Sequence, residues 1–324
     1  MAAVGVCVLV GAAACSGAAA SRGTPPAVTV PPTAGPSTTS TSSTSSTTPT
    51  SAPPKPTLPP GPPYQVGSTT VQLVDSSRPT VSHGHTVSNS RALTTLVWYP
   101  LVSRRSPLIV FAHGYQVGPA PYESMLQAWV AHGYVVAAPE FPLTDQDIAG
   151  ANLDENDINN QPDDIRFVTD SLVATGSAVA ARIDPLRVCV AGHSDGAESA
   201  LAASIAPTPA GEPAFRALVA MSVQELPGVS HTSNPPMLVT QGDADNINPP
   251  SYGYTTYQDG ASPKFLLVIK GGGHLPPLQA GSAWLAGIEA VTEGFVDAYV
   301  ASDGPVARIG SATAGSPLFA LSSG

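Results

Sequence analysis

The strongest chemical signal in the chain is a G-x-S-x-G pattern at residues 192–196, centred on Ser194. A run of apolar residues typical of a buried strand precedes it, and an alanine-rich segment typical of a helix follows it. A strand–turn–helix context makes the turn so tight that Gly192 and Gly196 have no room for side chains, while the serine projects into the cleft. The pattern therefore predicts Ser194 as a nucleophile, placed at a helix amino end that favours developing negative charge.

A serine hydroxyl needs a base to accept its proton, and the chain has seven histidines. Where this motif follows a strand of a parallel sheet, the nucleophile, the acid and the histidine come in that order along the chain. His274, in a glycine-rich segment after the last apolar run, satisfies this order, whereas His231 precedes the best candidate for the acid. We therefore expect His274 to be the general base.

The acid must orient the imidazole and stabilise its cation. Asp243 and Asp245 both follow the apolar run 237–240, and Glu225 follows the preceding run. Asp245 stands four positions before Pro249, a spacing common in hydrolases of this kind, which favours it over the other two. Asp243 is expected to shape the turn by bonding backbone amides.

Two backbone N–H groups are expected to stabilise a tetrahedral oxyanion. One belongs to Asp195, the residue after the nucleophile, and the other to Tyr115, in the loop after the apolar run 108–112. Gly114 lets that loop turn close to the substrate. The Tyr115 ring then either forms a wall of the acyl pocket or is an exposed loop aromatic.

Alternating strand and helix patterns predict a mostly parallel central sheet with helices on both faces, and ligands at the carboxyl ends of its strands. The expected strands cover 71–74, 93–99, 108–112, 134–138, 187–191, 218–221, 237–240 and 264–269, and the expected helices 122–132, 163–174, 197–205 and 282–300. Residues 222–235 are too few for a large lid.

The 324 residues carry 13 basic and 23 acidic side chains, a net charge of −10. This balance argues against nucleic-acid binding, which needs a concentrated basic surface. Acidic residues gather between Glu140 and Asp170, where we expect a solvated loop and helix face. Their spacing matches no EF-hand loop, and we expect neither a metal ion nor a cofactor.

The first residues are expected to export the protein. Residues 1–20 are almost entirely small or apolar, too short a run to span a bilayer, and residues 1–22 are expected to be a secretory or lipoprotein signal. Cys15 follows small residues and is a candidate for lipidation, and the alternative is cleavage near Ala20 with release of the protein. With the N-terminus processed, Cys189 has no disulfide partner.

The remaining chain divides into three parts by composition. Residues 23–63 are rich in Pro, Ser and Thr and are expected to form a disordered linker, because they bury too little apolar surface to offset their chain entropy. Residues 64–302 are expected to be the catalytic domain and 303–324 a C-terminal tail. We expect a monomer, either tethered to the cell surface or secreted.

Several segments together resemble the α/β-hydrolase serine esterases of bacteria, in particular the dienelactone-hydrolase-like, platelet-activating-factor acetylhydrolase-like and polyester-hydrolase-like enzymes. The resemblance covers nearly all of residues 64–300. It implies triad roles for Ser194, Asp245 and His274, and oxyanion roles for Tyr115 and Asp195. The segments that carry it are 91–93, 97–100, 107–114 and 133–139, together with the motif at 192–196.

These features predict a serine hydrolase that cleaves small carboxylic esters through an acyl-enzyme. Because the insert 140–163 is acidic, it should repel anionic substrates, so short, neutral acyl esters are expected. Two alternatives stay open. One is peptidase or acyltransferase use of the same triad, and the other is a non-catalytic surface lipoprotein that uses the fold as a binding module.

Overall fold

The computed structural model describes residues 62–224, 233–302 and 304–324. The chain divides into a unit of Met1–Pro56 and a unit of Thr57–Gly324, and all the described residues belong to the second. The predicted signal segment, Cys15 and the linker as far as residue 61 lie outside the described residues, as do Glu225 and His231. Among the described helices, none has both the length and the apolar character needed to cross a bilayer.

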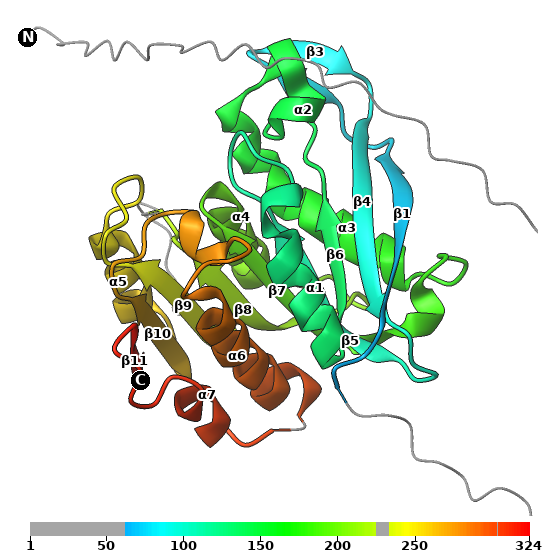
Figure 1. Cartoon of the computed structure of the whole chain (residues 1–324). Coiled ribbons are helices and arrows are strands. Elements are labelled where there is room, and N and C mark those ends of the chain that lie inside the picture. Colours follow the sequence, from blue (N-terminus) through cyan, green and yellow to red (C-terminus); the bar gives the residue numbers. More distant parts are fainter. Residues whose placement is uncertain (1–61, 225–232, 303) are drawn as a thin grey trace, which may run out of the picture. The chain divides into compact units, whose positions relative to one another are not determined.

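A nine-stranded sheet forms the centre of the described unit, in the order β1-β4-β6-β5-β7-β8-β9-β10-β11 (Figure 1). The strands from β6 to β10 in this order run parallel, and β1, β4 and β11 are antiparallel to their neighbours. This arrangement confirms the predicted α/β-hydrolase fold. The strands of the sheet are β1 Val66–Asp75, β4 Arg91–Pro100, β5 Ser106–Ala112, β6 Val135–Pro139, β7 Ile183–His193, β8 Phe215–Met221, β9 Met237–Gly242, β10 Lys264–Ile269 and β11 Phe319–Ser323, and a separate hairpin joins β2 Thr80–Ser82 to β3 His85–Ser88.

The position of a strand in the sheet explains whether its residues are all buried or alternate in burial. Every residue of β5 and β6 is buried, because helices cover both faces of these inner strands. In β1, at one edge, half-buried and exposed side chains alternate. The alternation shows that only one face of the edge strand packs against the protein.

Helices cover both faces of the sheet (Figure 1). Side chains of α1 and α6 pack in one buried cluster, and side chains of α3 and α4 pack in the other. The helices are α1 Glu123–His132, α2 Gln146–Ala149, α3 Gln161–Val173, α4 Asp195–Ile205, α5 Pro250–Asp259, α6 Leu285–Val296 and α7 Ala307–Ser311.

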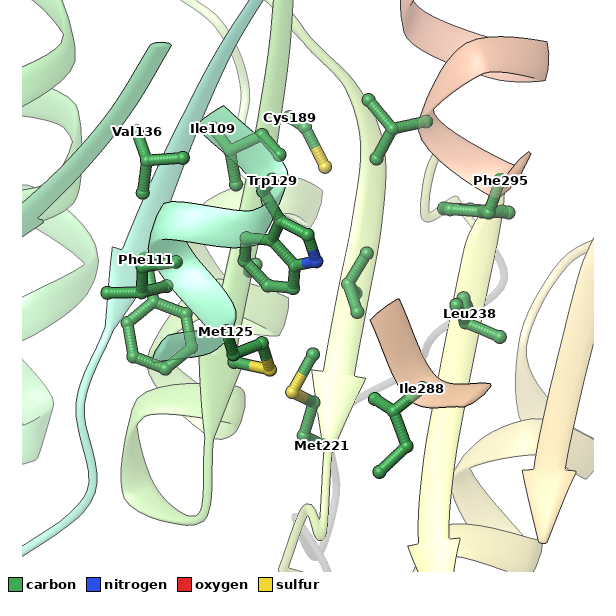
Figure 2. Close-up of a cluster of buried hydrophobic side chains, with 14 of the residues drawn as sticks. Ile109, Phe111, Met125, Trp129, Val136, Cys189, Met221, Leu238, Ile288 and Phe295 are labelled. Carbon is green, nitrogen blue, oxygen red and sulfur yellow. The ribbon is translucent and has the colours of Figure 1, made fainter. Parts of the chain in front are cut away.

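Figure 2 shows how the first cluster is built across the sheet. Ile109 of β5, Cys189 of β7 and Leu238 of β9 point to the same face, where Trp129 of α1 and Phe295 of α6 cover them. Their immediate neighbours along each strand point to the opposite face and join the second cluster, as the two-residue period of a strand requires. Cys189 is therefore a core side chain, as predicted, and it forms no disulfide.

Glycine ends helix α1 at the predicted position. Gly133 follows the helix with φ of 134°, and its N–H donates to the carbonyls of Trp129 and Val130. L-residues rarely adopt this φ, so glycine is needed for the chain to turn into β6.

The segment predicted to be a C-terminal tail belongs to the domain. It carries α7 and β11, and β11 pairs antiparallel with β10 from Phe265↔Ser323 to Ile269↔Phe319. The boundary at residue 302 is therefore wrong. Small and polar residues hide this strand in the sequence, since an edge strand needs backbone pairing more than apolar side chains.

The acidic segment also differs from the prediction. Asp157 and Asp164 are buried, and both accept hydrogen bonds from the buried guanidinium of Arg91 in β4. The expected solvated face is wrong for these two residues and also for Asp145 and Asp154, which are buried as well. Charge spacing along the chain could not show it, because Arg91 is 66 and 73 residues away from its partners.

Candidate active site

A strained turn carries Ser194 between β7 and α4. Its φ of 56° lies in the left-handed region, which a residue with a side chain adopts at a cost of about 1–3 kcal/mol. A Cβ at Gly192 would collide with the backbone of Gly196, and a Cβ at Gly196 would collide with the backbone of Ala112. Both glycines are therefore required by the close approach of main chains, as the motif predicted.

His274 lies beside this serine. It follows β10 after the glycine-rich turn 271–273, and its Nε2 is 2.9 Å from the Oγ of Ser194. Its Nδ1 is 2.8 Å from Oδ2 of Asp245, in the loop after β9. The three side chains come from the carboxyl ends of β7, β9 and β10, where the sequence placed the chemistry.

Asp245 is held as a carboxylate. Its Oδ1 accepts the N–H groups of Ile247 and Asn248, each at 2.9 Å. Burial raises the pKa of Asp245, but the hydrogen bond and charge interaction with His274, together with these two N–H groups, bring it below the ordinary value. Nδ1 of His274 must therefore carry the proton, which leaves Nε2 free to accept one from Ser194.

Asp243 takes a different place from Asp245. Its Oδ1 accepts the N–H of Gly271 at 2.6 Å, and its Oδ2 lies 3.5 Å from Nζ of Lys270. It therefore braces the turn that precedes His274 and does not contact the imidazole, in keeping with the turn-shaping role predicted for it.

The loop with the second proposed oxyanion donor lies against the nucleophile. A Cβ placed on Gly114 would be 3.2 Å from the Cβ of Ser194, a tight contact, so glycine favours this close approach of the backbone to the serine. Within the described residues, the N–H groups of Tyr115 and Asp195 donate to no other residue, although the Asp195 N–H interacts with its own carboxyl group. They are available as donors to a ligand oxygen, and the half-buried ring of Tyr115 lies in the same loop.

Two more carboxyl groups lie close to the nucleophile on α4. Burial raises the pKa of Asp195 to about 6 and the pKa of Glu198 to about 8, and Glu155 contributes to both shifts. Oδ2 of Asp195 and Oε1 of Glu198 have no hydrogen-bond partner. At neutral pH Asp195 is therefore mostly ionised and Glu198 mostly protonated, and sequence reasoning assigned no role to Glu198.

Sequence reasoning also missed Tyr122 and the contacts of His193. The Nδ1 of His193 lies 2.8 Å from the Tyr122 hydroxyl, and both side chains are buried beside Ser194. The motif shows that His193 precedes the nucleophile, but nothing in the sequence indicates its partner, which is 71 residues away.

The described part of the chain holds no cluster of three or more His, Cys, Asp or Glu side chains arranged to bind a metal ion. Its residues do provide a hydroxyl, an imidazole and a carboxylate, each hydrogen-bonded to the next. Such an arrangement can activate the hydroxyl as a nucleophile.

Comparison with protein families places this geometry in a known context. Residues 62–252 match the family model for chlorophyllase, and this range includes Ser194 and Asp245 and ends before His274. No individual curated protein matches the chain. The expected resemblance to α/β-hydrolase serine esterases is confirmed at this level. Since the match covers more than half of the sequence, the chain belongs to the chlorophyllase family, a family of α/β-hydrolase-type esterases.

Proposed function

We propose that the protein hydrolyses carboxylic esters with a triad of Ser194, His274 and Asp245. The unbroken hydrogen-bond sequence from the serine hydroxyl through the imidazole to the carboxylate is the observation that carries this proposal. Nε2 of His274 takes the proton from Ser194 as Oγ forms a bond to the ester carbonyl carbon. Asp245 keeps the imidazole oriented and stabilises the cation that forms.

The tetrahedral intermediate then collapses to an acyl-enzyme. The N–H groups of Tyr115 and Asp195 donate to the oxyanion, and His274 gives its proton to the leaving alkoxide as the carbon–oxygen bond breaks. A water molecule repeats the sequence: His274 takes its proton, the hydroxide attacks the acyl carbon, and Ser194 leaves with the proton restored. The products are a carboxylic acid and an alcohol, so atoms and charges balance.

Labelling with a fluorophosphonate probe tests the activated serine. We expect the wild-type chain to be labelled at Ser194 and Ser194→Ala to stay unlabelled, because only an activated hydroxyl attacks the probe. An unlabelled wild type would contradict the proposal and favour the non-catalytic binding module. A labelled chain that turns over peptides faster than esters would favour the peptidase alternative.

We propose short, neutral acyl esters as substrates. The pKa of Asp195, about 6, leaves this carboxyl group mostly ionised at neutral pH, and its negative charge beside Ser194 disfavours anionic esters. A series of p-nitrophenyl esters from acetate to palmitate tests this proposal. We expect kcat/KM to be higher for butyrate than for palmitate, and the reverse order would refute the preference.

We also propose that the protein is exported as a monomer and held at the cell surface by lipid on Cys15. Each buried methylene of an acyl chain adds about 0.8 kcal/mol of membrane affinity. Replacing Cys15 with Ser should move the protein from a detergent-extracted membrane fraction to the soluble fraction, with specific activity unchanged. A wild-type protein that is already soluble, with a mature N-terminus beyond Cys15, would instead support a cleaved signal.

A further inference from the structure

A buried chain of hydrogen bonds passes behind Ser194 and joins two loops of the site. It runs from the N–H of Gly114 to the hydroxyl of Tyr122 at 3.3 Å, and from this hydroxyl to Nδ1 of His193 at 2.8 Å. It ends where Nε2 of His193 lies 3.1 Å from the main-chain carbonyl of His274. Tyr122 and His193 are at most 2% exposed, so water does not reach these groups, and loss of a bond would leave a buried polar group without a partner.

The chemistry of the four groups determines where each proton lies. A carbonyl oxygen only accepts, so Nε2 of His193 must carry a hydrogen and donate it to His274. Burial, reinforced by the electrostatic interaction with His274, lowers the pKa of His193 to about 3, so this ring is neutral and its Nδ1 is an acceptor. Tyr122 therefore donates its O–H to His193 and accepts the N–H of Gly114.

Each end of this chain lies next to a group that the proposed reaction uses. Gly114 precedes Tyr115, whose N–H is the proposed oxyanion donor, and His274 is the proposed base. The His193 and His274 rings are also in contact, with centroids 4.6 Å apart. A displacement at either end therefore changes the distance between the base and the oxyanion donor.

We propose that Tyr122 and His193 are positioning residues. They keep the loop that contains Gly114 and Tyr115 at a fixed distance from the main chain of His274, on either side of Ser194. This inference rests on the proposed esterase function. Neither side chain exchanges a proton with the substrate. Both are needed because the loops at Gly114 and His274 are far apart in the sequence, and these hydrogen bonds join them.

Tyr122→Phe tests the chain with little loss of packing, since the ring that contacts Phe111 at 4.8 Å is kept. Tyr134→Phe is the matched control. Its hydroxyl is also buried and also bonds twice, to Asp297 and Glu293, but it lies at the amino ends of the strands. We expect Tyr122→Phe to lower kcat for p-nitrophenyl butyrate by about 5- to 30-fold with KM within about twofold, because two buried polar groups lose their partner. Tyr134→Phe should leave both constants within about twofold, although its thermal stability falls.

A second pair of variants separates positioning from general damage. In His193→Gln the side-chain amide can still donate to the carbonyl of His274, whereas His193→Leu removes both contacts. We expect His193→Gln to retain at least about threefold more activity than His193→Leu. The low-field proton NMR signal of the bond between His274 and Asp245 should be sharp in wild type and in Tyr134→Phe, and broadened in Tyr122→Phe.

The outcomes distinguish this inference from the function on which it rests. If the fluorophosphonate labels wild type and Tyr122→Phe at equal rates, the positioning role is overturned and the esterase proposal stands. If Tyr134→Phe loses as much activity as Tyr122→Phe, the effect is one of stability and the positioning role is again overturned. A wild type that does not react with the probe overturns both.

Discussion

Among the described residues, two histidine rings are hydrogen-bonded to carboxylates, at opposite ends of the parallel strands. His274 at the carboxyl ends has one nitrogen 2.8 Å from Asp245 and the other 2.9 Å from a hydroxyl. His132 at the amino ends has Nδ1 3.1 Å from Glu293 and Nε2 3.1 Å from Asp297. The residue types are the same, but the number of carboxylates around the ring differs.

That difference decides what each histidine can do. Burial lowers the pKa of His132, but hydrogen bonds to Asp297 and Glu293 raise it to about 9, so the ring is a cation at neutral pH. A cation with both nitrogens protonated is an ion-pair partner and cannot be a base. The second nitrogen of His274 faces the Ser194 hydroxyl, and a neutral imidazole there can accept the serine proton. A histidine–carboxylate contact is therefore no evidence of catalysis until the partner of the second nitrogen is known.

The largest expected effect on kcat comes from removing the Ser194 hydroxyl or the His274 imidazole. Ser194→Ala and His274→Ala should each lower kcat for p-nitrophenyl butyrate by at least about 10³-fold, with the far-UV circular dichroism unchanged. The double variant should be little worse than Ser194→Ala, because the two groups act as a unit. Wild-type turnover by Ser194→Ala would remove the basis of the comparison.

The same substitution in the two carboxylates is the sharpest comparison. Asp245→Asn should lower kcat by about 10²- to 10⁴-fold, because the amide can donate to the imidazole and so favour the wrong tautomer. Asp297→Asn should change kcat by less than about twofold. Measured on one ester at one pH, equal losses in the two variants would contradict the separation of roles.

The contribution of His132 to stability should depend on pH. His132 has a raised pKa, so its contribution to stability is complete below the unfolded value of about 6.5 and is lost as the pH rises through about 9. The sign follows because the folded state binds the proton more tightly than the unfolded state.

His132→Gln should therefore destabilise the protein at pH 6 and have little effect at pH 10. The expected loss at pH 6 is on the order of 2 kcal/mol after allowance for solvent screening of this partly exposed group, or about 5 °C in Tm. Thermal denaturation of wild type and variant at the two pH values measures the difference, and kcat serves as the internal control. A stability difference that grows with pH would contradict the cationic assignment.

The smallest expected effect is on the titration of His132 itself. Asp297→Asn leaves Glu293 as the single carboxylate beside the ring, and the pKa of His132 should fall by about one unit or more. Proton NMR of the imidazole ring over pH 6–10 measures this change. An unchanged pKa would show that Glu293 alone holds the cation and that the number of carboxylates matters less than we infer.

The sequence predicted the parts of the site that depend on local chain geometry or on chain order. The glycines around Ser194 indicate a tight turn. Because a few neighbouring residues determine this turn, it can be predicted without knowledge of the rest of the fold. The chain order of nucleophile, acid and histidine selected His274 from seven histidines, and the structure brings it together with Ser194 and Asp245. The buried strands beside these residues were predicted because uninterrupted apolar runs are typical of inner parallel strands.

Other parts depend on partners that are distant in the sequence. The strand β11 forms because β10 offers a free edge, and its own residues carry little strand pattern. Asp157 and Asp164 are buried because Arg91 lies between them, which their local composition does not reveal. In both cases the decisive interaction joins segments that only the folded chain brings together.

By itself, then, the sequence determined the turn around Ser194 and predicted Ser194, Asp245 and His274 as the candidate triad, because each follows from short-range sterics or from the connectivity of a parallel sheet. The tertiary structure alone decided which histidine–carboxylate contact leaves a nitrogen free, and which buried side chains, Tyr122 and His193, connect the loops around Ser194. Proton placement on an imidazole depends on the partners of both ring nitrogens, and those partners are set by distances between elements far apart in the chain.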